Sequence, residues 1–498
     1  MLAPVSHLPT TLDEAHQVIV RQQERIAELE KQVARVAVLE QQVEALQQHI
    51  EELVAKFGSS SLNSSKPPSS DSPEQRALRP KRKGSSRAQG GQPGHPRHER
   101  ALYPAEQVTR TEQYFPESIC PCGGAVAIDW GNPYCHQVTD IAPPPPPDVT
   151  EHQFYHGICQ SCGIKHHSQW PDWVPSGQMG AGVIAWVVIL SGQFRLSMRQ
   201  IQVLLWEMCQ IRFSTGAISN AQGKAIPWMG PLYRQVGQHV REQAVCHADE
   251  TRHYRGTNTY WLWALADNTV SYFMTHYSRG KAAADALLGS FSGYLVTDHF
   301  SGYGNVPPER RQLCWAHLIR HFRKIAGRCG EGGIVGKRLL LLAYATIRTH
   351  HRWQQHPDQA TRYRRRILRL RRSFQATLNQ GVALHNCKRT TNQCKHLLKD
   401  EAMCWTFLKD DRIPLTNNRA ERVIRPYVQW RKTSFASQSA QGDRFRPTVL
   451  TVLGTARQLG MNMATLMREV CSQGLAHKPV SVRFPLDQAS ACNPLQMA

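Results

Sequence analysis

The sequence is short of negative charge. Its 38 Asp and Glu residues face 60 Lys and Arg, which leaves a formal net charge of +22 at pH 7. An excess of this size favours a polyanionic partner, and clustering of the bases favours nucleic acid over an acidic membrane surface. The clusters are Arg76, Arg79, Lys81, Arg82, Lys83 and Arg87, and then Arg352, Arg362, Arg364, Arg365, Arg366, Arg369, Arg371 and Arg372. Basic residues that only solvate a surface are the alternative.

The sequence also lacks a long hydrophobic run. Its most apolar stretch, Ala181 to Leu190, is too short to cross a bilayer, so we expect a buried helix there. The first residues contain no apolar core of the kind that a secretory signal peptide requires. Most of the 14 cysteines stand alone, as is typical of reduced thiols in a cytosol. We therefore expect a cytoplasmic protein that does not bind a membrane.

A chain of 498 residues implies several domains, and the first one predicted is a helix with an apolar stripe. The stripe consists of Ile26, Leu29, Val33, Val36, Leu39, Val43, Leu46, Ile50 and Leu53. Heptads with one three-residue skip predict a left-handed coiled coil, so residues 1–57 are expected to pair copies of the chain. A lone amphipathic helix is the alternative. Residues 58–100, rich in Ser, Pro and charge, are expected to form a disordered basic linker that contacts phosphates.

Two short cysteine motifs lie within residues 101–172. Cys120-Pro121-Cys122 and Cys159-Gln160-Ser161-Cys162 stand beside glycines, at the bases of two expected turns. Paired turns of this kind frame a structural zinc ribbon, in which four thiolates surround one Zn²⁺. The first pair is C-x-C and not C-x-x-C, so other ligands remain open, namely Cys135, His136, His156, His166 and His167.

Residues 173–240 are predicted to be helical. Within them, two helices are expected to flank a turn at 210–214, with Ser214 or Thr215 capping the second helix. This arrangement fits a helix-turn-helix that reads DNA. Ordinary helix packing fits equally well, because two helices joined by a turn are common.

The pattern changes to strands from residue 241. Tyr260 to Ala266 and Val270 to Met274 are predicted strands, Lys281 to Ser290 a helix, and Gly293 to Thr297 a further strand. With a first strand over the apolar run Ala244 to Ala248, the order is three antiparallel strands, a helix and a strand. This order is the start of a ribonuclease H-like fold, which we assign to residues 241–316. The long basic helical segment 317–410 is interpreted as an insertion. The core resumes at 411–440, and 441–498 is a helical segment with a tail.

Three acidic residues stand in contexts that suit metal ligands. Asp249 and Asp298 each end an apolar stretch, on what we expect to be strand ends, and Glu421 lies at the start of a predicted helix. Hard cations such as Mg²⁺ require oxygen ligands, and two such ions about 4 Å apart serve phosphodiester chemistry. Two alternatives remain open from the residues alone. Asn418 and Glu421 have the spacing of a helix-capping pair, and Glu250 competes with Asp249 as a ligand.

Further motifs accompany these acids in a fixed order. They are Asn63 to Asp71, Gly90 to His95, Ala248 to Thr251, Gly302-Tyr303, Cys314 to His317, Asn417 to Arg422 and Arg431 to Phe435. Together with the zipper and the cysteine motifs, they resemble the transposases of the insertion-sequence 66 family, within the Asp-Asp-Glu recombinase superfamily. The resemblance covers nearly the whole chain. It implies that Asp249, Asp298 and Glu421 are the catalytic acids, holding Mg²⁺ or Mn²⁺, and that 317–410 is a helical insertion.

The resemblance implies a bacterial, nucleoid-associated DNA transposase. Such an enzyme binds the inverted-repeat ends of its element, cleaves at their 3′ ends and joins them to target DNA, with accessory element-encoded proteins as partners. Supporting roles are expected for Asn418, His317, Arg422 and Arg425, and a packed histidine and solvated arginines are the alternatives. Two other functions remain open. They are a catalytically inactive DNA-binding regulator and a structure-selective nuclease of the ribonuclease H fold.

Overall fold

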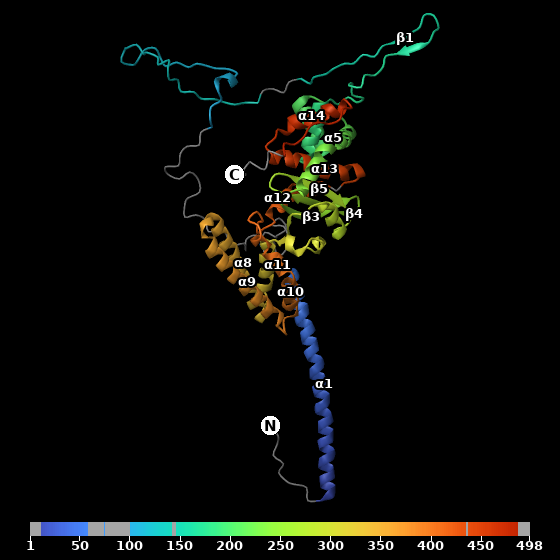
Figure 1. The fold of residues 1–498 in the computed structure, drawn as a ribbon, viewed down its shortest axis with the longest axis vertical. Coiled ribbons are helices and arrows are strands. Elements are labelled where there is room, and N and C mark those ends of the chain that lie inside the picture. The colour runs from blue at the N-terminus through green and yellow to red at the C-terminus, as the bar shows by residue number, and fades with distance from the viewer. Residues whose placement is uncertain (1–10, 58–73, 75–99, 142–145, 435–436, 487–498) are drawn as a thin grey trace. The chain divides into compact units, whose positions relative to one another are not determined.

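The computed structural model describes residues 11–57, 74, 100–141, 146–434 and 437–486 (Figure 1). The chain divides into two compact units, each built from two distant segments. The helical unit comprises Met1–Arg79 and Tyr294–Asn417, and the sheet unit comprises Pro80–Gly293 and Asn418–Ala498. Strands and helices occur in both units, so the predicted mixed α/β class is confirmed. None of the described helices is long and apolar enough to cross a membrane.

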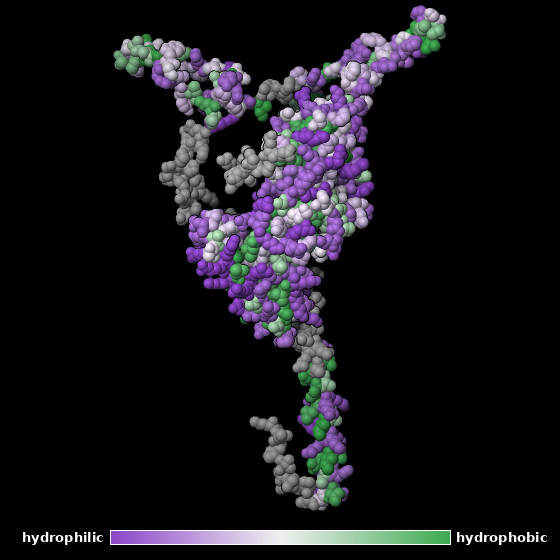
Figure 2. Space-filling view, viewed as in Figure 1, coloured by the Kyte–Doolittle hydropathy of each residue, from purple (hydrophilic) through white to green (hydrophobic). Residues whose placement is uncertain are grey.

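Helix α1 (Leu12–Phe57) is a single helix of 46 residues (Figure 1). Its described apolar stripe is open to solvent, since the exposed fractions run from 46% at Leu29 to 69% at Val33. Hydrophobic side chains gather along this helix in Figure 2. Such a row is stable in water only against a partner surface, so pairing of two copies stays a prediction. Its second half, Val43 to Leu53, and nearly all of the predicted linker lie outside the described side chains.

The sheet unit is built around three antiparallel strands. β3 (Val245–Arg255) and β4 (Asn258–Ala266) form a hairpin, and β5 (Ser271–His276) continues it on the other side of β4. Gly256 in the hairpin turn has a φ of +56°, a conformation that glycine adopts at little cost. α6 (Lys281–Leu288) packs on β4. The strands and the helix predicted between residues 256 and 290 are confirmed.

Helices cover this sheet and bury its apolar side chains. α12 (Asn418–Thr433) packs on β3 and β4, while α13 (Ala440–Gln458) packs on β5 and on α5 (Thr215–Arg241). α3 (Ala181–Gly192) packs against α14 (Met463–Leu475), and Ile184 to Leu190 are largely buried, which confirms the predicted buried helix.

Two helices precede the sheet at the position of the expected helix-turn-helix. α4 (Met198–Cys209) begins at a capping box formed by Ser197 and Gln200. α5 begins at Ser214, whose hydroxyl accepts a hydrogen bond of 3.1 Å from the Ala217 N–H. The predicted turn and cap are therefore present. Because α4 and α5 pack on each other and α5 packs on α13, the helices also have the packing role that was the alternative to DNA reading.

The second segment of the helical unit begins with two parallel strands, β6 (Tyr294–Thr297) and β7 (Arg311–Leu313). Short 3-10 turns, η3 (Ser301–Tyr303) and η4 (Pro308–Arg310), lie between them. The segment after β7 then forms helices alone within the described residues. They are α7 (Trp315–Ala326), α8 (Gly330–Gln355), η5 (Pro357–Gln359), α9 (Ala360–Val382), α10 (Lys388–Lys399), α11 (Glu401–Cys404) and η6 (Thr406–Leu408).

Aromatic rings form the core of the helical unit. Trp315 lies 5.8 Å from Phe374 and 5.1 Å from Trp405 between ring centroids, and all three rings are buried. The Trp315 indole N–H also donates to the Cys404 carbonyl at 2.8 Å. This core ties α7, α9 and α11 to one another, so the long basic segment is a folded helical body and not an extended tail.

A buried histidine near the end of α8 makes the stability of this unit depend on pH. His350 is 3% exposed, and its Nδ1 lies 2.9 Å from the Tyr363 hydroxyl. Burial lowers the pKa of His350 to about 4. As pH falls, this histidine therefore becomes protonated at a higher pH in the unfolded chain than in the folded one. This contribution to stability is complete above the ordinary pKa near 6.5 and is lost as pH falls toward 4.

We predict that His350→Gln weakens this pH dependence. Between about pH 7.5 and about pH 5.5, the wild-type protein should lose about 1 kcal/mol more of its unfolding free energy than the variant does. Urea unfolding at the two pH values measures the difference. His351→Gln, a change at the exposed neighbouring histidine, is the matched control and should behave as the wild type does. Equal losses in wild type and His350→Gln would contradict the assignment.

Candidate functional site

Asp249 lies inside β3 and not at a strand end, so that part of the prediction is wrong. The strand continues to Arg255 because Glu250 to Arg255 pair with β4 as far as Asn258. The apolar run therefore stops where one face of the strand turns polar, not where the strand stops. Asp249 is half-buried, opposite Ala264.

Glu250 points to the other face of β3, because successive side chains alternate along a strand. Its Oε1 accepts hydrogen bonds from the Arg279 Nε at 3.1 Å and from Nη2 at 2.8 Å. The Glu250 side chain is 1% exposed, so this ion pair balances a buried charge. Glu250 thus has a structural task, which favours its neighbour Asp249 as the ligand for a metal.

The face of β3 that carries Asp249 is the face on which α12 packs. Thr251 and His253 share that face, and both are held by the helix. The Arg431 Nη1 donates to the Thr251 Oγ1 at 3.1 Å, and the Tyr427 hydroxyl is hydrogen-bonded to the His253 Nδ1. The other ring nitrogen of His253 lies 2.8 Å from the Asp443 Oδ1, so α13 joins the same buried network.

The first turn of α12 is attached near the other end of β3, beside the residues where this strand begins. The Arg419 guanidinium donates to the carbonyls of Asp267 at 2.6 Å and Asn268 at 2.9 Å, directly after β4. Ala266, the last residue of β4, pairs with His247, two residues before Asp249. Glu421 lies between Arg419 and Tyr427 along the helix and is half-buried. Asp249 and Glu421 therefore belong to one unit, on the strand face and the helix that pack together.

Glu421 lies in the first turn of α12, as predicted. Asn418 is the first helical residue, and the helix runs on to Thr433. Pro426 lies inside the helix and does not end it, because Tyr427 and Arg431 beyond it are held to β3. Asn418, Arg422 and Arg425, the supporting residues predicted on this helix, are exposed, so the two guanidinium groups are accessible to an anion.

Asp298 directly follows β6, at a strand end as predicted, and belongs to the helical unit. The boundary between the units falls at Gly293–Tyr294, inside the range 241–316 that the sequence assigned to one domain. Within the described residues, the Asp298 carboxylate accepts one hydrogen bond, from the Phe300 N–H to Oδ1 at 3.0 Å.

Arg311 on β7 holds the backbone around Asp298. Its Nε donates to the Thr297 Oγ1 at 2.9 Å, and its Nη2 donates to the carbonyls of Asp298 at 3.0 Å and Phe300 at 2.7 Å. It is 4% exposed, and a buried guanidinium requires such acceptors. The sequence patterns did not predict this role. The feature that could have indicated it is a single arginine at the start of a short buried strand.

A histidine-aspartate cluster next to Asp298 was also missed. The His299 Nε2 lies 2.7 Å and the His396 Nδ1 3.6 Å from the Asp400 Oδ2. These three ligand atoms lie within 4.8 Å of one another, the spacing of a group that could hold a metal ion. Burial lowers the pKa of His299 against the opposing effect of Asp400, which favours the neutral imidazole at pH 7. The cluster links the residue after Asp298 to the junction of α10 and α11.

His317, predicted as a supporting residue, lies in the first turn of α7 in the helical unit and is half-buried. Its Nε2 lies 3.3 Å from the Arg320 Nη1, one turn further along the helix. This contact fits a packed histidine as well as one that orients a neighbouring group, so both interpretations of His317 remain.

The two cysteine motifs each form a local turn. The Cys120 N–H donates to the Gly124 carbonyl at 2.8 Å, and the Cys159 N–H donates to the Ile164 carbonyl at 2.9 Å. The second turn joins β1 (His156–Ile158) to β2 (Lys165–His167), and η2 (Ala105–Gln107) precedes the first.

Hydrogen bonds within these turns favour thiolates. The Gly124 backbone and the Cys120 side chain lower the pKa of Cys122, and the backbones of Cys162 and Ser161 lower that of Cys159. A lowered pKa suits a zinc ligand, since the metal binds the deprotonated thiol. Among the residues that the structure describes, the sulfurs of the two turns do not gather into one group of ligand atoms.

Comparison with known proteins gives a match across both units. A family model described as Transposase IS66 family matches residues 176–444, a range that contains Asp249, Asp298 and Glu421. A second model, of a family of unknown function, matches residues 19–101.

Two similar proteins come from Sinorhizobium fredii (strain NBRC 101917 / NGR234). The uncharacterized protein y4jD is 23% identical over 344 residues, which cover 63% of this chain and 66% of y4jD. The uncharacterized protein y4qI is 26% identical over 278 residues, which cover 47% of this chain and 50% of y4qI. The chain thus spans less than two thirds of the length of each of these relatives.

We predict opposite stability effects for the two neighbouring acids on β3. Glu250→Gln removes the charge that balances Arg279, and should lower the unfolding free energy by about 1–2 kcal/mol, because Arg279 is partly solvated. Asp249→Asn should leave the melting temperature unchanged or raise it. The change removes a half-buried negative charge, while the amide oxygen can still accept the hydrogen bond that the Glu250 N–H donates. Thermal unfolding of both variants measures this. A larger loss in Asp249→Asn than in Glu250→Gln would reverse the roles.

Proposed function

Because the chain belongs to the Transposase IS66 family, we propose that it is a DNA transposase that cleaves at the ends of its element and joins them to target DNA. In the first step, water attacks a phosphodiester and releases a 3′-hydroxyl. In the second, that hydroxyl attacks a phosphodiester of the target strand and displaces a target 3′-oxygen. Both steps need a deprotonated nucleophile and stabilisation of negative charge on two oxygens.

The proposed catalytic residues are Asp249, Asp298 and Glu421, and their meeting in one site is part of the proposal. The observation that carries it is the placement of Asp249 and Glu421 on a strand face and a helix that pack together, within the matched family range. Carboxylate oxygens fit Mg²⁺ or Mn²⁺, and such ions, when bound, lower the pKa of an attacking water and stabilise the leaving oxygen. Arg311 would position Asp298 through its hydrogen bonds to the carbonyls of Asp298 and Phe300.

The fold of the catalytic part is proposed to be ribonuclease H-like. The succession β3, β4, β5, α6 and β6 along the chain supports this, as does the return of α12 to β3 after a helical segment. Element ends would be recognised by the cysteine turns, the helices α3 to α5 and the basic linker, and copies would pair through α1. Accessory proteins encoded by the same element are further partners in this proposal.

Two other functions make different predictions. A catalytically inactive regulator is disfavoured, because all three acids are present and Glu250, the adjacent acid, has a separate ion pair. A structure-selective nuclease would use the same acids but give no joined products. Detection of strand-transfer products with a labelled element end separates a transposase from such a nuclease.

The acids themselves provide the first test. In an assay with end-containing DNA and Mg²⁺, Asp249→Asn, Asp298→Asn and Glu421→Gln should each reduce cleavage to background while end binding persists, since only the metal ligands change. Glu250→Gln is the matched control and should cleave at about 25 °C, where its lower stability is tolerated. Metal-dependent cleavage by any of the three acid variants would remove that residue from the site.

We also propose that Cys120, Cys122, Cys159 and Cys162 bind one structural Zn²⁺. Metal analysis of the purified protein should find about one zinc per chain, and Cys159→Ser with Cys162→Ser should lose it. Cys329→Ser, a change at an exposed cysteine outside the two turns, is the control and should retain the metal. Zinc retained by the double variant, or its absence from the wild type, would contradict the proposal.

A further inference from the structure

The helical unit carries an unusual concentration of positive charge. Between residues 332 and 399 there are fifteen lysines and arginines and a single acid, Asp358. Six of the arginines occur as pairs one helical turn apart. Arg348 and Arg352 on α8 form one such pair, and Arg362 with Arg366 and Arg365 with Arg369 form two on α9. Residues four apart lie on the same helix face, so each pair presents two guanidinium groups in one direction.

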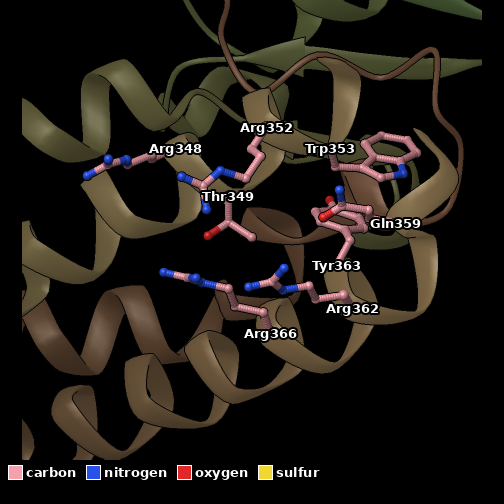
Figure 3. A pocket seen from close by; sticks show the side chains of 8 residues that line it. All are labelled: Arg348, Thr349, Arg352, Trp353, Gln359, Arg362, Tyr363 and Arg366. Atoms are coloured by element: carbon pink, nitrogen blue, oxygen red, sulfur yellow. The ribbon is translucent and has the colours of Figure 1, made fainter. Parts of the chain in front are cut away.

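The pair on α8 and the pair of Arg362 and Arg366 on α9 line a single cavity at the end of the α8–α9 hairpin. The cavity has a volume of about 250 Å³. Figure 3 shows the arginines of the two helices across the cavity from one another, with Trp353, Gln359 and Tyr363 closing one side. All four arginine side chains are exposed, so the cavity is open to a macromolecule.

The four arginines of this cavity form no ion pair within the described part of the chain. No carboxylate of a described residue lines the cavity. Arg371, further along α9, is the contrast, since its Nε and Nη2 bind the Glu401 carboxylate at 3.0 and 2.9 Å. Because a guanidinium stays protonated at any physiological pH, the four charges repel one another until an anion binds.

Uncharged side chains close one side of the cavity. Trp353 and Tyr363 stack with their ring centroids 4.7 Å apart and an interplanar angle of 12°. The Tyr363 hydroxyl is hydrogen-bonded to the buried His350, which joins the stack to the core. Because burial lowers the pKa of His350 to about 4, this histidine is neutral at pH 7 and the charge of the site comes from the arginines alone. Because Trp353 lies on α8 and Tyr363 on α9, the stack joins the two helices beside the four arginines.

We propose that this cavity binds backbone phosphates of DNA. The planar guanidinium donates two parallel hydrogen bonds to a phosphate, and arginines on facing helices can grip its oxygens from two sides. A second cavity continues along α9, shares Arg362 and Arg366, and adds Arg365 and Arg369. Asp358 is the one carboxylate in its lining, against four arginines, so neighbouring phosphates of one strand can follow the helix. DNA as the source of the phosphates rests on the proposed transposase function, and phosphate contacts of this kind position a duplex without reading its sequence.

The test compares two double variants of the full-length protein that remove equal charge from the helical unit. Arg348→Gln with Arg362→Gln changes the cavity. Arg364→Gln with Arg372→Gln changes two arginines of α9 that line neither cavity. Affinity for an end-containing duplex is measured against salt concentration in the presence of a chelator, so that cleavage plays no part. An RNA duplex of the same length is the second probe.

The cavity variant should bind DNA at least tenfold more weakly at physiological salt. Its plot of log affinity against log salt should be shallower by about 0.9 for each phosphate that the variant no longer binds. The control variant should match the wild type. Equal weakening of both variants would show a general basic surface and overturn the proposal, as would no weakening of either. Weakened RNA binding with unchanged DNA binding would also overturn it.

The binding test is independent of the proposed catalysis. If the wild type binds DNA through the cavity but never cleaves it, the transposase proposal fails and the phosphate site stands. If the wild type cleaves and joins DNA while the cavity variant binds normally, the phosphate site fails and the proposed function stands.

Discussion

The packing of α12 on one face of β3 is the constraint on which the candidate site depends. Arg419 holds the start of the helix to the carbonyls after β4, while Tyr427 and Arg431 hold its later turns to His253 and Thr251. Between these attachments, the helix brings Glu421 to the strand face that carries Asp249. Because side chains alternate along β3, Asp249 and Glu250 point to opposite faces of the strand. Glu250 is the buried partner of an ion pair with Arg279.

Hydrogen bonds of buried polar side chains also fix local conformations in the helical unit. Arg311 satisfies its buried guanidinium on the Thr297 hydroxyl and the carbonyls of Asp298 and Phe300, which holds the turn after β6. His299 is held by Asp400. Unpartnered polar groups of this kind are costly when buried, so each anchor specifies a conformation as well as stabilising it. In contrast, the cavity arginines of α8 and α9 are exposed and have no such partner among the described residues, and this difference distinguishes binding residues from anchors.

Local patterns predicted much of the fold and part of the site. Apolar runs and turn residues were sufficient for β4, β5, α6, β6 and the buried helix α3. They failed where long-range pairing decides the outcome. The pairing of Glu250 to Arg255 with β4 carries β3 past the end of its apolar run. Arg279, Arg311 and Asp400 contact residues 29, 14 and 101 positions away, and no local pattern records such separations. Residue type and context selected the three acids as possible metal ligands, and the family resemblance favoured Glu421 as a catalytic acid over the helix-capping alternative.

Asp249, Asp298 and Glu421 are proposed to bind the same metal ions, although they are divided between two units. Cleavage of the protein backbone by Fe²⁺ in place of Mg²⁺ tests it most directly, because hydroxyl radicals cut the chain beside the bound metal. Mass spectrometry should find cuts next to all three acids, all suppressed by excess Mg²⁺. Cuts near His299 and Asp400 with none near Asp249 and Glu421 would place the metal in the histidine-aspartate cluster and contradict the account.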